Sequence, residues 1–158
     1  MNYEFNADEI FKMAEQMERN GARFYRNAAE GVTDEKNRDM LLKLAAMEDD
    51  HEKTFAEMRA ALTDQEKVAN IFDPEGESIL YLKALVDTRV FFKKEIDTTS
   101  MKEILKEALL AEKDAIVFYL GMKDMVPEEL GQSRLEAIIT EEMLHIRLLG
   151  KELESVTP

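Results

Sequence analysis

The chain has 158 residues, enough for one domain with a sizeable core. Its 34 acidic and 21 basic residues leave a formal net charge of −13, which argues against binding to nucleic-acid phosphates or anionic membrane surfaces. The absence of cysteine excludes disulfides, thiol nucleophiles, and iron–sulfur or zinc–thiolate sites.

The chain shows no pattern typical of a targeting or membrane-spanning segment. The N-terminal residues 1–5 lack the basic region and apolar run of a signal peptide, and no apolar stretch approaches the roughly 18 residues that span a bilayer. The composition is rich in Ala, Leu, Glu, Lys and Met, with only six Gly and three Pro, which favours helices. We expect an all-α, cytoplasmic protein in which residues 1–158 form a single domain.

Hydrophobic periodicity predicts two long helices in the first part of the chain. The first runs from a cap at Asn6 or Asp8 to about residue 30. The second runs from a cap at Thr33 or Asp34 to about residue 62. Because the turn between them is short, the two helices should be antiparallel neighbours.

A crossover of residues 63–100 follows. Its clearest break is the Asp-Pro-Glu-Gly run at 73–76, and residues 78–94 have a helical pattern. That pattern ends in an apolar run containing Phe91 and Phe92, which we expect to seal one end of the core, with a dimer contact as the alternative. A crossover of this length predicts that the third helix starts parallel to the second.

Two more helices complete the predicted four-helix bundle. Ser100 and Glu103 have the spacing of a capping box and open a helix that runs to about residue 123. Pro127 suits the first turn of the last helix, which we expect to reach about residue 154.

The two histidines of the chain lie in matching motifs, Glu48-x-x-His51 and Glu142-x-x-His145, offset by 94 residues. A Glu and a His three residues apart lie on the same face of a helix, so both side chains can reach one ion. Two such motifs in one chain indicate an internal duplication that preserves a metal-ligand set.

The same duplication extends to the preceding helices. Thirty residues before each motif Glu stands another acid, Glu18 or Glu112, and a Phe-Tyr pair follows each of these, ending in Tyr25 and Tyr119. All four acids lie within apolar helix faces, where an unpaired charge would cost several kcal/mol. Carboxylate and imidazole together suit iron or manganese, and the pattern does not separate these two metals.

Other polar residues near the motifs need a separate interpretation. Tyr25 and Tyr119 at helical spacing are typical of core residues, and the alternative is a hydrogen bond from each phenol to a ligating carboxylate. We expect Glu15 to lie on a solvated helix face. We expect the same of Glu141, with a supporting role beside the metal site as the alternative.

The motifs resemble the rubrerythrin-like branch of the ferritin-like superfamily over nearly the whole chain. The matching segments are Glu18 to Tyr25, Glu48-x-x-His51, Glu112 to Tyr119 and Glu142-x-x-His145. The resemblance implies a ferritin-like four-helix bundle with a crossover helix and a non-haem centre of two iron ions. It implies that Glu48 and Glu142 bridge the ions, that Glu18 and His51 complete one shell, and that Glu112 and His145 complete the other.

Two features depart from rubrerythrin itself. Ala115 stands where that family has a further glutamate, and a chain without cysteine cannot carry its iron–thiolate domain. The resemblance therefore implies a stand-alone oxidoreductase that reduces peroxide or dioxygen with electrons from an external donor, and we expect a homodimer. The alternatives are a ferroxidase that stores or delivers iron, and a bundle whose metal is structural or absent.

Overall fold

The computed structural model describes residues 6–64, 77–88 and 97–157, and within them every regular element is helical. The four long helices are α1 (Ala7–Glu30), α2 (Glu35–Ala60), α5 (Met101–Lys123) and α6 (Gln132–Val156). A shorter helix, α4 (Glu77–Thr88), lies in the crossover between α2 and α5. The predicted all-α bundle with a crossover helix is confirmed. The break at 73–76, and Phe91 and Phe92, lie outside the described residues.

Side-chain caps fix where three of the long helices begin. Asn6 and Asp34 each accept a hydrogen bond, of 2.9 Å, from the backbone N–H three residues further on. Ser100 accepts the corresponding bond at 3.3 Å. Each cap satisfies one of the N–H groups that an α-helix leaves unpaired at its start. The predicted starts of α1, α2 and α5 are therefore confirmed to within a residue or two.

The predicted start of the last helix is wrong by several residues. Pro127 leads into a 3-10 turn, η1 (Glu128–Leu130), and not into the α-helix itself. Gly131 then adopts φ +104°, a left-handed conformation that residues with a Cβ rarely adopt, and α6 starts only at Gln132. The glycine interrupts the helical hydrogen-bond pattern, and the proline is left outside α6.

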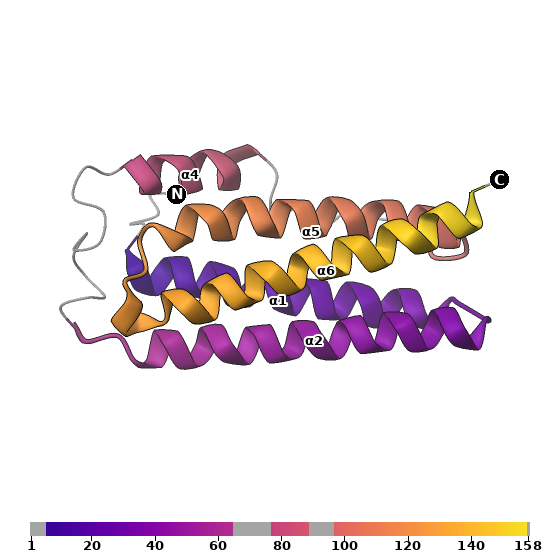
Figure 1. Ribbon diagram of the computed structural model, residues 1–158, viewed down its shortest axis with the longest axis horizontal. Coiled ribbons are helices and arrows are strands. Elements are labelled where there is room, and N and C mark those ends of the chain that lie inside the picture. The colour runs from indigo at the N-terminus through magenta and orange to yellow at the C-terminus, as the bar shows by residue number, and fades with distance from the viewer. Residues whose placement is uncertain (1–5, 65–76, 89–96, 158) are drawn as a thin grey trace.

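The helices form two antiparallel hairpins, α1 with α2 and α5 with α6, packed side by side (Figure 1). The helices α2 and α5 run in the same direction, as the long crossover predicts. The crossover helix α4 lies against α5, where the Tyr81 hydroxyl donates to the Val117 carbonyl at 2.9 Å. A Cβ on Gly121 would lie 2.5 Å from the Tyr81 ring, so this contact requires glycine.

The apolar core consists of two clusters at different heights along the bundle. One contains Phe11, Phe55 and Tyr119, and the other contains Leu41 and Leu149. In each long helix about two to three turns separate the buried apolar residues of one cluster from those of the other, and these turns carry buried acids or histidines. A polar layer therefore crosses the middle of the core.

None of the described helices has a stretch long and apolar enough to cross a membrane.

Candidate metal centre

Six ionisable side chains occupy the polar layer between the two apolar clusters. Every long helix supplies at least one of them, and none is more than 4% exposed. They are Glu18 on α1, Glu48 and His51 on α2, Glu112 on α5, and Glu142 and His145 on α6. The structure thus brings together all six side chains that the sequence pattern selected.

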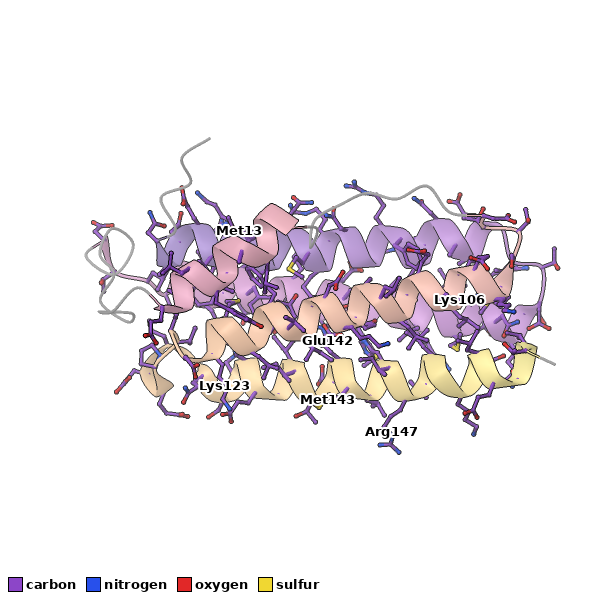
Figure 2. The ribbon with its side chains drawn as sticks, turned by 90° about the horizontal axis from the view of Figure 1, so that it is seen from above. Met13, Lys106, Lys123, Glu142, Met143 and Arg147 are labelled. Carbon is purple, nitrogen blue, oxygen red and sulfur yellow. The ribbon has the colours of Figure 1, made fainter. Side chains whose placement is uncertain are left out.

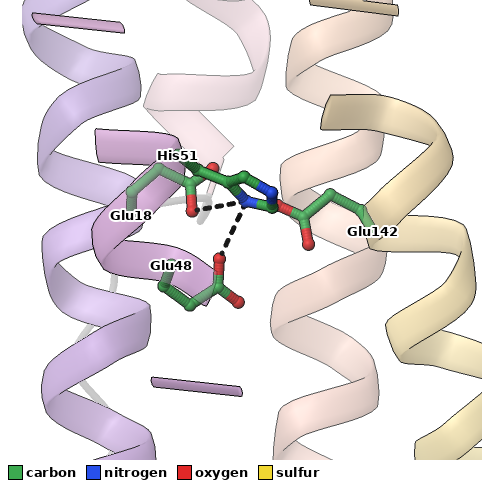
Figure 3. Close-up of side chains that lie close together, drawn as sticks. All are labelled: Glu18, Glu48, His51 and Glu142. Atoms are coloured by element: carbon green, nitrogen blue, oxygen red, sulfur yellow. Dashed lines mark ion pairs between the residues drawn. The ribbon is translucent and has the colours of Figure 1, made fainter. Parts of the chain in front are cut away.

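Around His51, the ring nitrogen Nδ1 faces three carboxylates. It lies 3.5 Å from Glu18 Oε2, 3.3 Å from Glu48 Oε2 and 3.2 Å from Glu142 Oε1 (Figure 3). The three acids come from three different helices, so this group forms only when the bundle is assembled.

Around His145, Nδ1 faces three carboxylates in the same way. It lies 3.6 Å from Glu48 Oε1, 3.3 Å from Glu112 Oε1 and 2.9 Å from Glu142 Oε2. On α6, Glu142 lies between the helices while Met143 and Arg147 point away from the bundle (Figure 2).

The two groups share two of their acids, Glu48 and Glu142. Within each group of three acids and one histidine, the potential ligand atoms all lie within 4.8 Å of one another. The two imidazole rings are stacked with their centroids 5.9 Å apart. This is an arrangement for two neighbouring cations, each with its own histidine and its own terminal acid.

Unpaired polar atoms show that the cluster suits cations. Oε2 of Glu48, Oε2 of Glu142 and Nδ1 of both histidines are buried without a hydrogen-bond partner among the described residues. Buried polar groups of this kind are costly unless paired. Ligand atoms around one first-row metal ion are about 3 Å apart, because each metal–ligand bond is about 2 Å long, and the spacings around each Nδ1 fit that value.

Without cations, the cluster retains protons. Burial raises the pKa of Glu18 and Glu112 well above that of an ordinary carboxyl group, and the neighbouring carboxylates add to the rise. Burial would lower the pKa of each histidine, but the surrounding acids outweigh this effect. They raise the pKa of His145 to about 12, and they raise the pKa of His51 as well. Two divalent cations would take the place of these protons as counter-charge.

The shared acids shift in the opposite direction. Burial would raise the pKa of Glu48, but the nearby Glu18 carboxyl group and the two imidazoles favour its charged form and lower the pKa. Burial would also raise the pKa of Glu142, but the imidazoles of His145 and His51 lie close to its oxygens and lower it. The shared acids are therefore ionised and ready to accept cations from both sides.

The two tyrosines of the repeated Phe-Tyr pairs reach the acids across the bundle. The Tyr25 hydroxyl on α1 donates to Glu112 on α5, and the Tyr119 hydroxyl on α5 donates to Glu18 on α1. Burial raises the pKa of both phenols, so each remains a protonated donor. Each tyrosine is thus a core residue that also holds one carboxylate.

Glu141 combines the two roles considered from the sequence. Its side chain is 50% exposed, yet its Oε2 lies 2.5 Å from Nε2 of His51. This is the ring nitrogen that does not face the three buried acids of the cluster. It reaches from α6 to a histidine on α2, 90 residues away. No local sequence signal indicates this contact, because it depends on how the two helices pack.

Glu15 does not lie on a solvated face, contrary to the sequence-based expectation. It is only 6% exposed, and it accepts a hydrogen bond from the Arg59 guanidinium on α2. Burial raises the pKa of its carboxyl group, and the charge of Arg59 opposes that rise. Arg59 makes the buried position tolerable, and the periodicity of α1 alone could not reveal this partner.

The chain matches no family model and no curated protein. Among solved structures it is similar to the crystal structure of a candidate ferritin-like diiron-carboxylate protein from Thermotoga maritima, with a TM-score of 0.73. The two are 25% identical, and the match covers 99% of this chain and 100% of that one. The similarity and the buried cluster support the ferritin-like superfamily and a site for two metal ions, and they do not select the rubrerythrin-like branch.

Proposed function

We propose that this chain is a non-haem dinuclear iron oxidoreductase that reduces peroxide or dioxygen with electrons from an external donor. The observation that carries the proposal is the pair of buried groups, each with three carboxylates and one imidazole, that share two acids. The similar Thermotoga maritima protein, a candidate diiron-carboxylate protein, supports the choice of iron.

The residues of the chain would hold the two ions in the following way. Glu48 and Glu142 would bridge them, because each acid belongs to both groups. Glu18 and His51 would complete the coordination shell of one ion. Glu112 and His145 would complete the shell of the other. An iron pair bound there supplies the electrons for reducing the oxidant.

The protein around the ions would control their geometry and their exposure to water. Tyr25 and Tyr119 each hold a terminal carboxylate through a hydrogen bond, so those acids keep a single orientation. The apolar clusters above and below the polar layer exclude bulk water. Small oxidants could reach the centre through the pocket between α2 and α6 that His51 and Glu141 line.

Two sequence features shape the proposed activity. Ala115 is buried on α5 and offers no carboxylate, so the centre has six ligands and not the seven of rubrerythrin itself. The chain contains no cysteine, so each turnover draws electrons from a separate donor protein or reductant.

Rapid mixing tests the proposal. Protein loaded anaerobically with two Fe(II) ions per chain is mixed with hydrogen peroxide or with dioxygen, and oxidation is followed by absorbance. We expect oxidation of the bound iron to be much faster than that of free Fe(II), and we expect Glu48→Gln to abolish the difference. Oxidation no faster than free Fe(II) would contradict the proposal. Fast oxidation followed by accumulation of ferric iron beyond two ions per chain would favour iron storage instead.

Metal analysis tests the cofactor independently of activity. Protein expressed in medium replete in both iron and manganese should retain close to two iron ions per chain. Anomalous scattering from crystals would identify the element at each position together with its ligands. Predominant manganese would contradict the proposed cofactor, and less than roughly one transition-metal ion per two chains would favour a structural bundle.

A further inference from the structure

The internal duplication is not exact beside the metal centre, and one difference touches a histidine. The offset of 94 residues that relates His51 to His145 also relates Met47 to Glu141. Glu141 lies 2.5 Å from Nε2 of His51. Nε2 of His145 is buried without a hydrogen-bond partner among the described residues, and a thioether at position 47 is only a weak acceptor.

The residues around the two histidines also differ in polarity, and the more polar surroundings are again those of His51. A pocket of ≈340 Å³ between α2 and α6 opens onto His51, and its lining includes Asp50 and Thr54. The duplication relates these two polar residues to Leu144 and Leu148, which are 41% and 44% exposed. The metal ligands are thus repeated, but the residues around them are not. Polar side chains line the pocket beside His51, and leucines take their positions in the second repeat.

The contact with Glu141 has a direct consequence for metal binding. Both histidines turn Nδ1 toward the acids, so Nδ1 must carry the free electron pair that binds an ion. A carboxylate that accepts the proton on Nε2 fixes this tautomer, fixes the ring orientation and makes Nδ1 more basic. Glu141 provides this support for His51, whereas the described part of the chain offers no such acceptor to the His145 ring.

We propose that the two ion positions are unequal: the position beside His51 fills first, from solvent through the pocket between α2 and α6, and Glu141 is its positioning residue. Asp50 and Glu141 bring negative charge to the lining of that pocket, and Arg134, which also lines it, is paired with Glu57 at 2.6 Å. The remaining negative charge attracts a hydrated cation. The inference rests on the proposed two-metal centre and adds an order of filling to it.

Substoichiometric loading tests the order directly. Crystals of the metal-free protein receive one equivalent of Co(II), a stand-in for Fe(II) that is stable in air, and anomalous difference maps give the occupancy of each position. In solution, competition with a coloured chelator gives the two stepwise affinities. We expect the cobalt signal beside His51 to be at least several-fold stronger than that beside His145.

Matched exchanges at the two related positions test the role of Glu141. Glu141→Met copies the first repeat and should weaken the tighter binding step about 10- to 100-fold. Met47→Glu copies the second repeat and should bring the occupancies closer together. Glu141→Gln keeps an acceptor for the Nε2 proton, so it should retain much of the affinity that Glu141→Met loses.

The possible outcomes separate this inference from the proposed function. Equal filling of both positions, filling beside His145 first, or unchanged affinities in Glu141→Met would overturn the inference and leave the two-metal centre intact. Failure of the wild-type protein to bind Co(II) or Fe(II) at all would overturn both. The wild-type occupancies decide the order even where a variant fails to fold.

Discussion

The α1–α2 and α5–α6 hairpins carry the same ligands but support them with different neighbours. On the first hairpin, buried Glu15 pairs with Arg59. The duplication relates these two residues to Leu109 and Leu153 on the second hairpin, which pack at the edge of an apolar cluster. An ion pair in one hairpin therefore corresponds to an apolar pair in the other.

This difference shows which parts of the duplication the site constrains. The acids and histidines are repeated because an ion requires specific ligand atoms at specific distances. The positions beside the ligands only require side chains that fill the space without leaving a buried charge unpaired. Either an ion pair or two leucines meets that requirement. The supporting residues can therefore diverge, and at Glu141, which corresponds to Met47 in the first repeat, the divergence reaches His51.

The largest effect should come from the shared acids, because each of them belongs to both ion positions. Glu48→Gln and Glu142→Gln each remove a ligand from both ion positions, so we expect each to lower metal affinity by at least about 100-fold, or about 2.7 kcal/mol. Iron content after dialysis against a chelator measures this. Glu18→Gln and Glu112→Gln, which belong to one group each, are the controls and should spare one ion. Retention of two ions in Glu48→Gln would show that it is not a bridging ligand.

The next largest effect should separate the hairpins. Arg59→Leu leaves Glu15 buried without its partner and should lower the free energy of unfolding by about 2–3 kcal/mol. The double variant Glu15→Leu/Arg59→Leu copies the second hairpin and should be within about 1 kcal/mol of wild type. Denaturant unfolding of the metal-free proteins measures both. A double variant as unstable as Arg59→Leu would mean that the two hairpins are not interchangeable at these positions.

A pH dependence should be common to both hairpins. Glu18, Glu112, His51 and His145 have folded-state pKa values above their unfolded values, so their contribution is complete at low pH and is lost as the pH rises. For His145 the loss extends from about pH 6.5 to about pH 12. Glu48 and Glu142, with lowered pKa values, are ionised in both states above about pH 6.5 and add no slope there.

The metal-free protein should therefore lose stability between about pH 7 and pH 9, by about 1.4 kcal/mol per pH unit for each extra proton that the folded state holds. Thermal unfolding at a series of pH values measures the slope. The protein with two bound ions should lack this slope, because cations have replaced the protons. A metal-free protein that becomes more stable over the same range would contradict the protonated cluster.

The smallest effect should come from the crossed tyrosines and should be equal on the two sides. Tyr25→Phe and Tyr119→Phe each remove one hydrogen bond to a terminal carboxylate, and we expect each to weaken binding at one ion position by about 1–2 kcal/mol. Stepwise Co(II) affinities measure this. The two phenylalanine variants control for each other, and a loss confined to one of them would show that only one tyrosine orients its acid.

Much of the architecture follows from local rules that can be applied to the sequence. The caps at Asn6, Asp34 and Ser100, and the apolar periodicity between them, depend on residues a few positions apart. The six polar residues of the central layer were identifiable for a similar reason, because each interrupts an apolar helix face and because the duplication repeats their spacing. The late start of α6 depends on the left-handed conformation at Gly131, which the helical pattern does not reveal.

Periodicity, spacing and short turns in the sequence are enough to predict the long helices, their pairing into hairpins and the residue types that meet in the middle of the bundle. The pairing of Arg59 with Glu15, of Tyr25 with Glu112 and of Glu141 with His51 is visible only in the folded bundle. These contacts join residues 44 to 90 positions apart along the chain, and they form only when helix packing fixes which side chains face each other.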